Sequence, residues 1–264
     1  MASSLDLGAY FARIGWNGAT DPTFQTLAGI LHAHTGAIPF ENLDVLLGRP
    51  PRLDLEGLQD KLVTRRRGGY CFEHATLMAA VLAELGFKPA THAARVVLAR
   101  PKEQTPRNHM FLTVPLDGET YLVDPGFASY SAREPLPLRA GTLGTHQSHV
   151  LTQDGDLWTL HVRRDGAQIP GWVATLAPEQ PIDFEVSNHW IATCPSSPFT
   201  QLLMMSAMTE AGRVNVMNRD VTLPGGETRR LGERKELRDL LAAHFGFDLP
   251  EVETLNVPAI DGWR

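Results

Sequence analysis

Residues 67–85, which read RGGYCFEHATLMAAVLAEL, contain a strong helix pattern that begins at a cysteine. Apolar residues of this stretch recur on one face, which predicts an amphipathic helix that runs to about residue 85 and stops at Gly86. Gly68 and Gly69 permit a tight turn directly before the helix. We therefore expect Cys71 in the first helical turn, where the positive end of the helix dipole favours a negative charge.

The position of Cys71 suggests a nucleophile. Three arginines, at 65–67, directly precede the turn, and both cationic neighbours and a helix N-terminus stabilise the reactive thiolate form. A free cysteine is more often a small buried apolar residue, so the hypothesis needs a base and an orienting carboxylate. Cys194, the second cysteine, lacks the glycine-rich context. Two cysteines form no disulfide framework, and a reducing, cytoplasmic location is the default expectation.

A candidate base and a candidate carboxylate lie in a predicted β-hairpin. The turn signal Asp117-Gly118 separates two apolar runs that are typical of strands. With this dipeptide as the turn, Asp124 lies opposite Phe111, and His109 shares its face on the diagonal, about 7–8 Å away at the backbone. A one-residue slip would place His109 and Asp124 on opposite faces. The register therefore places His109 and Asp124 together, and with Cys71 as the nucleophile they would form a Cys–His–Asp triad.

Other interpretations of these residues stay open at this point. His74 is an alternative base on the helical side of the cysteine, but its neighbour Glu73 points elsewhere and no other carboxylate stands at a suitable distance. His109 and Asp124 alone would also fit a hairpin with one polar face. The histidine pairs at 32/34 and 146/149 lack a third ligand nearby, so we expect no metal site.

The rest of the chain divides into three regions with different patterns. The first third is predicted to be helical, with an N-cap at Asp21 before a helix that ends near Gly36, and a short helix at 55–62. The middle third has short strand-like runs, which favour an antiparallel sheet or barrel, at 94–98, 110–114, 120–123, 157–162 and 171–175. The last third has a loop at 224–227 and a helix at about 233–245. We expect one compact α+β body.

Composition excludes several classes of protein. The chain has 264 residues, 43% of them hydrophobic and 20% charged, which is enough for a sizeable core and excludes a disordered chain. A net charge of −6 lacks the basic character of a nucleic-acid binder. The first residues have no signal-peptide pattern and no apolar run is long enough to span a membrane, so we expect no membrane partner.

Five segments resemble, in the same order, the motifs of the arylamine N-acetyltransferase family. They are IPFENL at 38–43, RGGYCFE at 67–73, NH at 108–109, VDPGF at 123–127 and the stretch 188–199. The match is weakest after about residue 200. The resemblance implies an N-terminal helical bundle over 1–88, a central antiparallel β-barrel over 89–200 and a C-terminal α/β lid over 201–264. It also implies a cysteine-protease-like triad of Cys71, His109 and Asp124, the residues reached above.

The activity implied by the resemblance is transfer of an acetyl group from acetyl-coenzyme A to arylamines, arylhydrazines or N-hydroxyarylamines, by a ping-pong mechanism through Cys71. Phe40, Phe127 and Phe199 are then implied to form the acceptor pocket. Thr105 and Gly126 are implied to contact coenzyme A. Acetyl-coenzyme A is the acyl-donor substrate, no metal or nucleic acid takes part, and the chain acts alone or as a homodimer.

Three other functions remain open on the sequence. One is an amide synthase of the same family, and another is a cysteine hydrolase or transglutaminase-like enzyme, because the Cys–His–Asp order is shared. The third is a ligand-binding module without catalysis. The acyl chain and the natural amine cannot be read from the residues. The loop at 224–226, with Arg229 and Arg230, is either a phosphate contact or a solvated hairpin, the latter being the commoner case.

Overall fold

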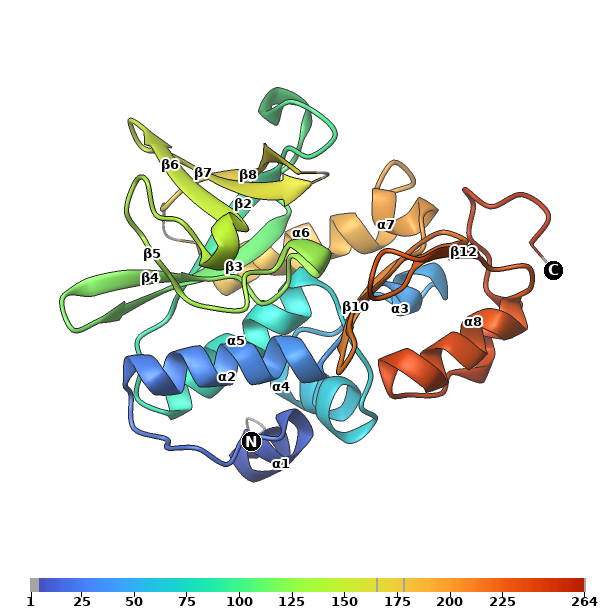
Figure 1. Cartoon of the computed structure of the whole chain (residues 1–264), viewed down its shortest axis with the longest axis horizontal. Helices are drawn as coiled ribbons and strands as arrows, with labels where there is room; N and C mark the ends of the chain where they lie inside the picture. Colours follow the sequence, from blue (N-terminus) through green and yellow to red (C-terminus); the bar gives the residue numbers. More distant parts are fainter. Residues whose placement is uncertain (1–4, 165, 178, 264) are drawn as a thin grey trace.

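The computed structural model describes residues 5–164, 166–177 and 179–263 and has an α+β architecture (Figure 1). A helical N-terminal part lies against a curled sheet, drawn in green to yellow, and a second sheet with its helices, drawn in orange to red, lies beside both. The first part contains α1 (Leu7–Ile14), α2 (Phe24–Ala37), β1 (Phe40–Glu41), α3 (Leu43–Leu46), α4 (Leu55–Leu58), the π-helical turn η1 (Gln59–Thr64) and α5 (Cys71–Glu84).

The curled sheet is antiparallel and has the strand order β5-β4-β3-β2-β8-β7-β6. Its strands are β2 (Ala90–Val96), β3 (His109–Leu116), β4 (Glu119–Val123), β5 (Leu136–Pro137), β6 (His149–Asp154), β7 (Leu157–Arg164) and β8 (Ala167–Thr175). Short 3-10 turns, η2 (Lys102–Gln104), η3 (Ala128–Tyr130) and η4 (Thr145–Gln147), lie in its connections. Strand β2 joins the two halves, because residues 90–94 pair with β3 and residues 95–96 pair with β8.

The C-terminal part begins with two helices, continues as a small sheet and ends with helical segments that cover the sheet. Its elements are α6 (Pro181–Thr193), α7 (Pro198–Gln201), β9 (Met204–Thr209), β10 (Gly212–Met217), β11 (Asp220–Thr222), β12 (Thr228–Arg230), α8 (Arg234–Leu240), η5 (Leu241–Phe245) and η6 (Pro250–Thr254). The strand order is β1-β9-β10-β11-β12. Strand β1 comes from the N-terminal part and pairs Phe40 with Ser206, so the two ends of the chain are joined through one sheet.

The hydrophobic core of the described residues consists of three clusters, two of which meet at β3. One cluster lies among the helices and includes Met110 and Leu112 of β3, whereas Phe111 belongs to a second cluster inside the curled sheet. The third cluster lies between the small sheet and α8. Because successive side chains of a strand point to opposite faces, β3 is buried on both sides, and its first residue, His109, is placed between two cores.

Most of the predicted elements are present, with corrections at their ends. The hairpin register is as predicted, with Leu112 opposite Val123, and the turn residues Asp117 and Gly118 both have positive φ. The N-cap of α2 is Thr23, whose hydroxyl accepts from a backbone N–H, so the prediction of Asp21 was wrong by two residues. The loop at 224–227 connects β11 and β12. None of the described helices is both long and apolar enough to cross a bilayer.

Candidate active site

Cys71 is the first residue of α5, as predicted, and the turn before it is held by close backbone packing. A Cβ atom on Gly68 would lie 2.2 Å from the carbonyl oxygen of Pro39, and one on Gly69 would lie 2.6 Å from Glu73 Oε2. The two glycines are therefore needed for close approach, because neither has the positive φ that glycine alone tolerates well. Glu73 Oε2 accepts a hydrogen bond from the backbone N–H of Tyr70, the residue before the helix, at 2.9 Å.

A buried ion-pair network supports this turn from behind. Lys61 Nζ lies 2.8 Å from Glu73 Oε1 and 2.7 Å from Asp44 Oδ2. The guanidinium of Arg67 lies 2.6 Å from Glu41 Oε1 and 3.1 Å from Asp44 Oδ1. Removing one partner of such a network leaves an uncompensated buried charge, which is strongly destabilising. The network joins the segment at 41–44 to the nucleophile helix.

Two of the three arginines before the turn are paired with carboxylates. Arg67 is committed to the network just described, and Arg65 pairs with Asp60 at the surface, 2.7 Å away. Their charges are therefore used to hold the turn and the surface rather than to face the thiol of Cys71. The helix N-terminus is the feature of the prediction that the structure retains at this thiol.

His109 lies between Cys71 and Asp124. Its Nε2 lies 2.9 Å from Asp124 Oδ2, and both side chains are almost completely buried. Burial lowers the pKa of His109, but the charge of Asp124, its hydrogen bond and the hydrogen bond with Cys71 together raise that pKa to about 10. Cys71 Sγ lies 3.8 Å from the carbonyl oxygen of Asn108. The structure thus brings together Cys71, predicted from the helix start, and His109 and Asp124, predicted from the hairpin register, with Nε2 of His109 turned to the carboxylate.

Trp172 is a member of the site that the sequence did not reveal. Its indole Nε1 donates to Asp124 Oδ2 at 3.0 Å, and its ring stacks on Phe111 with 4.5 Å between centroids. The side chain is fully buried in β8. Within the described residues, Asp124 Oδ1 has no hydrogen-bond partner, so both donors act on one oxygen. A predicted strand at 171–175 contained Trp172, but its position beside β3 depends on the long-range pairing of β2 with β8.

Aromatic rings surround the three polar residues. The ring of Phe127 lies 4.9 Å from the ring of His109. The ring of Phe199 lies 6.3 Å from that of Phe40 and 5.4 Å from that of Tyr70, the residue before Cys71. The rings of the three predicted pocket residues thus lie on two sides, one against the imidazole and two beside the start of α5.

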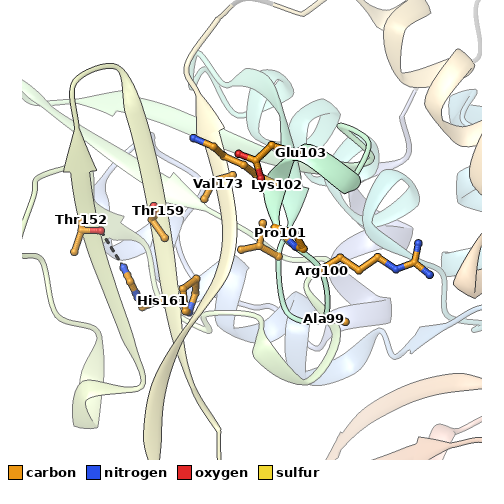
Figure 2. A pocket seen from close by; sticks show the side chains of 11 residues that line it. Ala99, Arg100, Pro101, Lys102, Glu103, Thr152, Thr159, His161 and Val173 are labelled. Carbon is orange, nitrogen blue, oxygen red and sulfur yellow. Dashed lines mark hydrogen bonds between the residues drawn. The ribbon is translucent and has the colours of Figure 1, made fainter.

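The two residues implied to contact coenzyme A are in different surroundings. A Cβ atom on Gly126 would lie 2.5 Å from the Cα of Cys71, so this glycine packs directly on the backbone of the nucleophile. Thr105 lies after η2, and its hydroxyl is within 3.3 Å of the carbonyl oxygen of Lys102. Residues 99–103 of this segment line a hollow of about 620 Å³ together with residues of the curled sheet, His161 among them (Figure 2).

The rival base, His74, is committed to a buried chain of hydrogen bonds. The carbonyl oxygen of Pro39 can only accept, so His74 Nε2 donates to it, at 3.2 Å, and Nδ1 accepts from His34 Nε2 at 2.8 Å. The remaining nitrogen of His34 is bonded to the hydroxyl of Tyr10 at 2.9 Å. Burial lowers the pKa of His74 to about 4. Among the described residues no cluster of three or more His, Cys, Asp or Glu is arranged to hold a metal.

Comparison with known proteins places this geometry in a family. Residues 23–254 match the family model described as N-acetyltransferase. The chain is 40% identical over 261 residues to an arylamine N-acetyltransferase of Mycobacterium bovis, covering 94% of this chain and 92% of the relative. It is 34% identical over 254 residues, covering 94% and 90%, to the arylamine N-acetyltransferase / N-hydroxyarylamine O-acetyltransferase of Salmonella typhimurium.

A solved structure of the Mycobacterium marinum arylamine N-acetyltransferase in complex with CoA superposes on the chain with a TM-score of 0.86. The identity is 36%, and 94% of each chain is covered. The α+β fold predicted from the resemblance is therefore confirmed, with its central barrel formed by the curled sheet. By sequence, fold and family model alike, the chain belongs to the arylamine N-acetyltransferase family.

Proposed function

We propose that this protein transfers an acetyl group from acetyl-coenzyme A to an aromatic amine, through an acetyl thioester on Cys71. The observation that carries the proposal is the contact of Cys71 with His109, which is itself bonded to Asp124, in a member of a family whose relatives are named for this activity. The printed name of the Salmonella relative adds N-hydroxyarylamines to the candidate acceptors, and arylhydrazines are a third class.

The first half-reaction forms the acyl-enzyme. The Cys71 thiolate attacks the carbonyl carbon of the acetyl thioester, the bond from that carbon to the coenzyme A sulfur breaks, and coenzyme A leaves as a thiol with the proton of the His109 imidazolium. The N–H groups in the first turn of α5 have no acceptors within the helix, so the N–H of Cys71 is a donor for the developing oxyanion.

The second half-reaction transfers the acetyl group to the amine. The amine nitrogen attacks the acetyl carbon, neutral His109 accepts the proton from that nitrogen, and the Cys71 thiolate is released. Asp124 keeps Nε2 of His109 occupied, so that Nδ1 faces the reacting atoms, and it stabilises the imidazolium that forms in each cycle. The three groups thus return to their starting charges after one turnover.

The aromatic rings fit this chemistry as walls. Phe127 covers His109, and Phe40 and Phe199 lie beside the start of α5, so a flat amine can pack between apolar faces. Exclusion of water protects the thioester from hydrolysis, and Cys71 is only 3% exposed. Gly126, which packs on the backbone of Cys71, and Thr105 are the proposed contacts for coenzyme A. We also infer a cytoplasmic site of action, consistent with two free cysteines.

The three-part division of the chain is part of the proposal. The helical segment 1–88 supplies Cys71, the segment 89–200 supplies His109 and Asp124, and the segment 201–264 covers them. Packing crosses these limits: Leu43 belongs to the core beside α8, and Phe184 of α6 belongs to the helical core. The segments are therefore expected to unfold together rather than as independent units.

Steady-state kinetics test the proposal directly. With acetyl-coenzyme A and an arylamine both varied, a ping-pong reaction gives parallel double-reciprocal lines. We expect turnover to be abolished by Cys71→Ala and retained by Cys194→Ala, because Cys194 lies at the end of α6 and contacts Ser196. Release of acetate without the amine at the rate of amine acetylation would indicate a hydrolase, and absence of turnover with every thioester would indicate a binding module.

The rate at which Cys71 is alkylated gives a second test, for which Cys194 is not a suitable reference. Cys194 is more exposed than Cys71, and its hydrogen bond from Ser196 lowers its pKa, so it competes for the reagent on access alone. The sharper comparison is Cys71 in the wild type with Cys71 in the Asp124→Asn variant. We expect the alkylation rate at neutral pH to fall in the variant, because an amide does not stabilise the imidazolium beside the thiolate.

A further inference from the structure

A second hollow, of about 760 Å³, lies where α2, the segment 129–134, the segment 145–149 and the start of β10 meet. We call it the arginine pocket, because Arg133, Arg163 and Arg213 all line it. Arg163 is exposed on β7, whereas Arg133 and Arg213 are partly buried. Three guanidinium groups converge here in a chain whose net charge is −6, so the charge of this pocket is opposite to that of the whole protein.

The protein does not neutralise these guanidinium groups. Among the residues that the structure describes, none of the three forms an ion pair. Glu134 is the carboxylate that lines the pocket, and its oxygens are occupied by the backbone N–H and the hydroxyl of Thr145. With three guanidinium groups and the carboxylate of Glu134 in its lining, the pocket keeps a net positive charge.

The hydrogen-bond partners of the two partly buried arginines, Arg133 and Arg213, are neutral. Arg133 Nη2 donates to the carbonyl oxygen of His32 at 3.2 Å and to its Nε2 at 3.0 Å. Arg213 Nη1 donates to the carbonyl oxygen of Ala128 at 3.2 Å and to the hydroxyl of Ser206 at 3.4 Å. Arg133 Nε is buried and, within the described residues, has no partner. An unpaired buried donor is unfavourable, so the neutral partners of Arg133 leave its guanidinium only partly satisfied.

The two arginines also raise each other's free energy. Burial lowers the pKa of both guanidinium groups, and the charge of Arg133 lowers that of Arg213 further. A bound anion would relieve this repulsion. Guanidinium groups match the tetrahedral oxygens of phosphate with paired N–H donors, and several of them around one hollow are typical of phosphate recognition.

The pocket is continuous with the wall of the candidate active site. The N–H of Phe127 donates to the hydroxyl of Ser131, at 2.7 Å, and the ring of Phe127 lies 4.9 Å from His109. Tyr130, which lines the arginine pocket, packs on Phe127 with 5.7 Å between centroids. The same short turn therefore contacts the imidazole on one side and the arginines on the other.

We propose that the arginine pocket binds the phosphate group of a small molecule. Two sources supply this chemistry, the phosphates of the acyl donor and a free phosphate compound that binds independently. The first source rests on the proposed function, and the second does not. The bound phosphate is expected to accept from N–H groups of Arg133, Arg163 and Arg213 that face the hollow.

Calorimetric titration with pyrophosphate tests the proposal. We expect saturable binding to the wild type, with a dissociation constant raised roughly tenfold or more in Arg213→Gln, because a charge-assisted hydrogen bond is lost. Arg163→Gln should weaken binding as well, and this exposed residue can be replaced without disturbing the core. Arg164→Gln is the matched control, because Arg164 is the exposed neighbour on β7 and does not line the pocket.

The source of the phosphate follows from competition and kinetics. If it belongs to the donor, coenzyme A displaces pyrophosphate, and Arg213→Gln raises the KM for acetyl-coenzyme A more than that for acetyl-pantetheine, which has no phosphate. If it is a free compound, coenzyme A and pyrophosphate bind together. Either outcome supports the pocket. Absence of pyrophosphate binding, or equal loss in Arg163→Gln and Arg164→Gln, overturns it, while turnover by the Arg164→Gln enzyme shows separately that the proposed function stands.

Discussion

Trp172 and His109 donate hydrogen bonds to the same oxygen of Asp124, at 3.0 Å and 2.9 Å. Two donors on one oxygen fix the rotation of the carboxylate. Since the charge of Asp124 raises the pKa of His109, the indole acts on the imidazole through the carboxylate. Trp172 is therefore a positioning residue rather than one that contacts the reacting atoms.

Replacing Trp172 with phenylalanine removes this donor and retains an aromatic ring. We expect kcat/KM to fall roughly tenfold, because a hydrogen bond to a charged group is lost. The rate of Cys71 alkylation should change with pH where His109 loses its proton. We expect this pH to fall below about 10 in the variant. Trp158→Phe is the control, because Trp158 belongs to the same core cluster and is not bonded to Asp124. Equal effects of both substitutions would reduce Trp172 to a packing residue.

Gly126 has no room for a side chain. In Gly126→Ala, the new Cβ would lie 2.5 Å from the Cα of Cys71, so either the start of α5 or the segment after Asp124 must move. We expect a lower melting temperature and a loss of turnover of roughly a hundredfold or more, because small displacements of reacting groups cost about that much. Gly8→Ala, on the exposed first turn of α1, should leave both unchanged. An active, stable Gly126→Ala enzyme would show that this packing is not required.

The buried pair of His34 and His74 predicts acid sensitivity. Burial lowers the pKa of both side chains, that of His74 to about 4, so both are neutral in the folded state. The unfolded chain binds protons at these positions below about pH 6.5, so the stability they permit is complete above that pH and is lost as the pH falls toward about 4. The free energy of unfolding is expected to fall by about 1.4 kcal/mol per pH unit for each histidine.

Urea unfolding between about pH 7 and pH 5 measures this slope. His74→Gln should reduce the pH dependence by the contribution of one histidine. His189→Gln should not, because His189 is exposed on α6. Identical slopes for the two variants would mean that the acid sensitivity has another origin.

The sequence predicted the parts of the site that depend on local spacing. The start of α5 at Cys71 followed from the glycines and the apolar face, and the diagonal of His109 and Asp124 followed from the two-residue turn. Trp172 could not be found in this way, because β8 reaches β3 only through its pairing with β2. The role of Arg67 was also hidden, since its partners Glu41 and Asp44 lie far away in the chain.

The fold was predicted less completely in its last third. The four short strands β9–β12 carry few residues each, and β1 joins them from the opposite end of the chain, which no local pattern indicates. Helix α6 was missed because its buried residues are few, Phe184, Asn188, Ile191 and Ala192, and most of its surface is solvated. The predicted helix at 233–245 is present, but it changes from α to π geometry at Leu241.

The central claim is that Cys71 carries the acetyl group, and mass spectrometry of the intact protein and of its peptides tests it most directly. After mixing with acetyl-coenzyme A and no amine, the account predicts a mass gain of one acetyl group on the peptide that contains Cys71. Addition of an arylamine should remove that gain and yield the acetylated amine in equal amount. An unmodified Cys71 in an enzyme that still acetylates the amine, or an acetyl group found only on Cys194, would contradict the account.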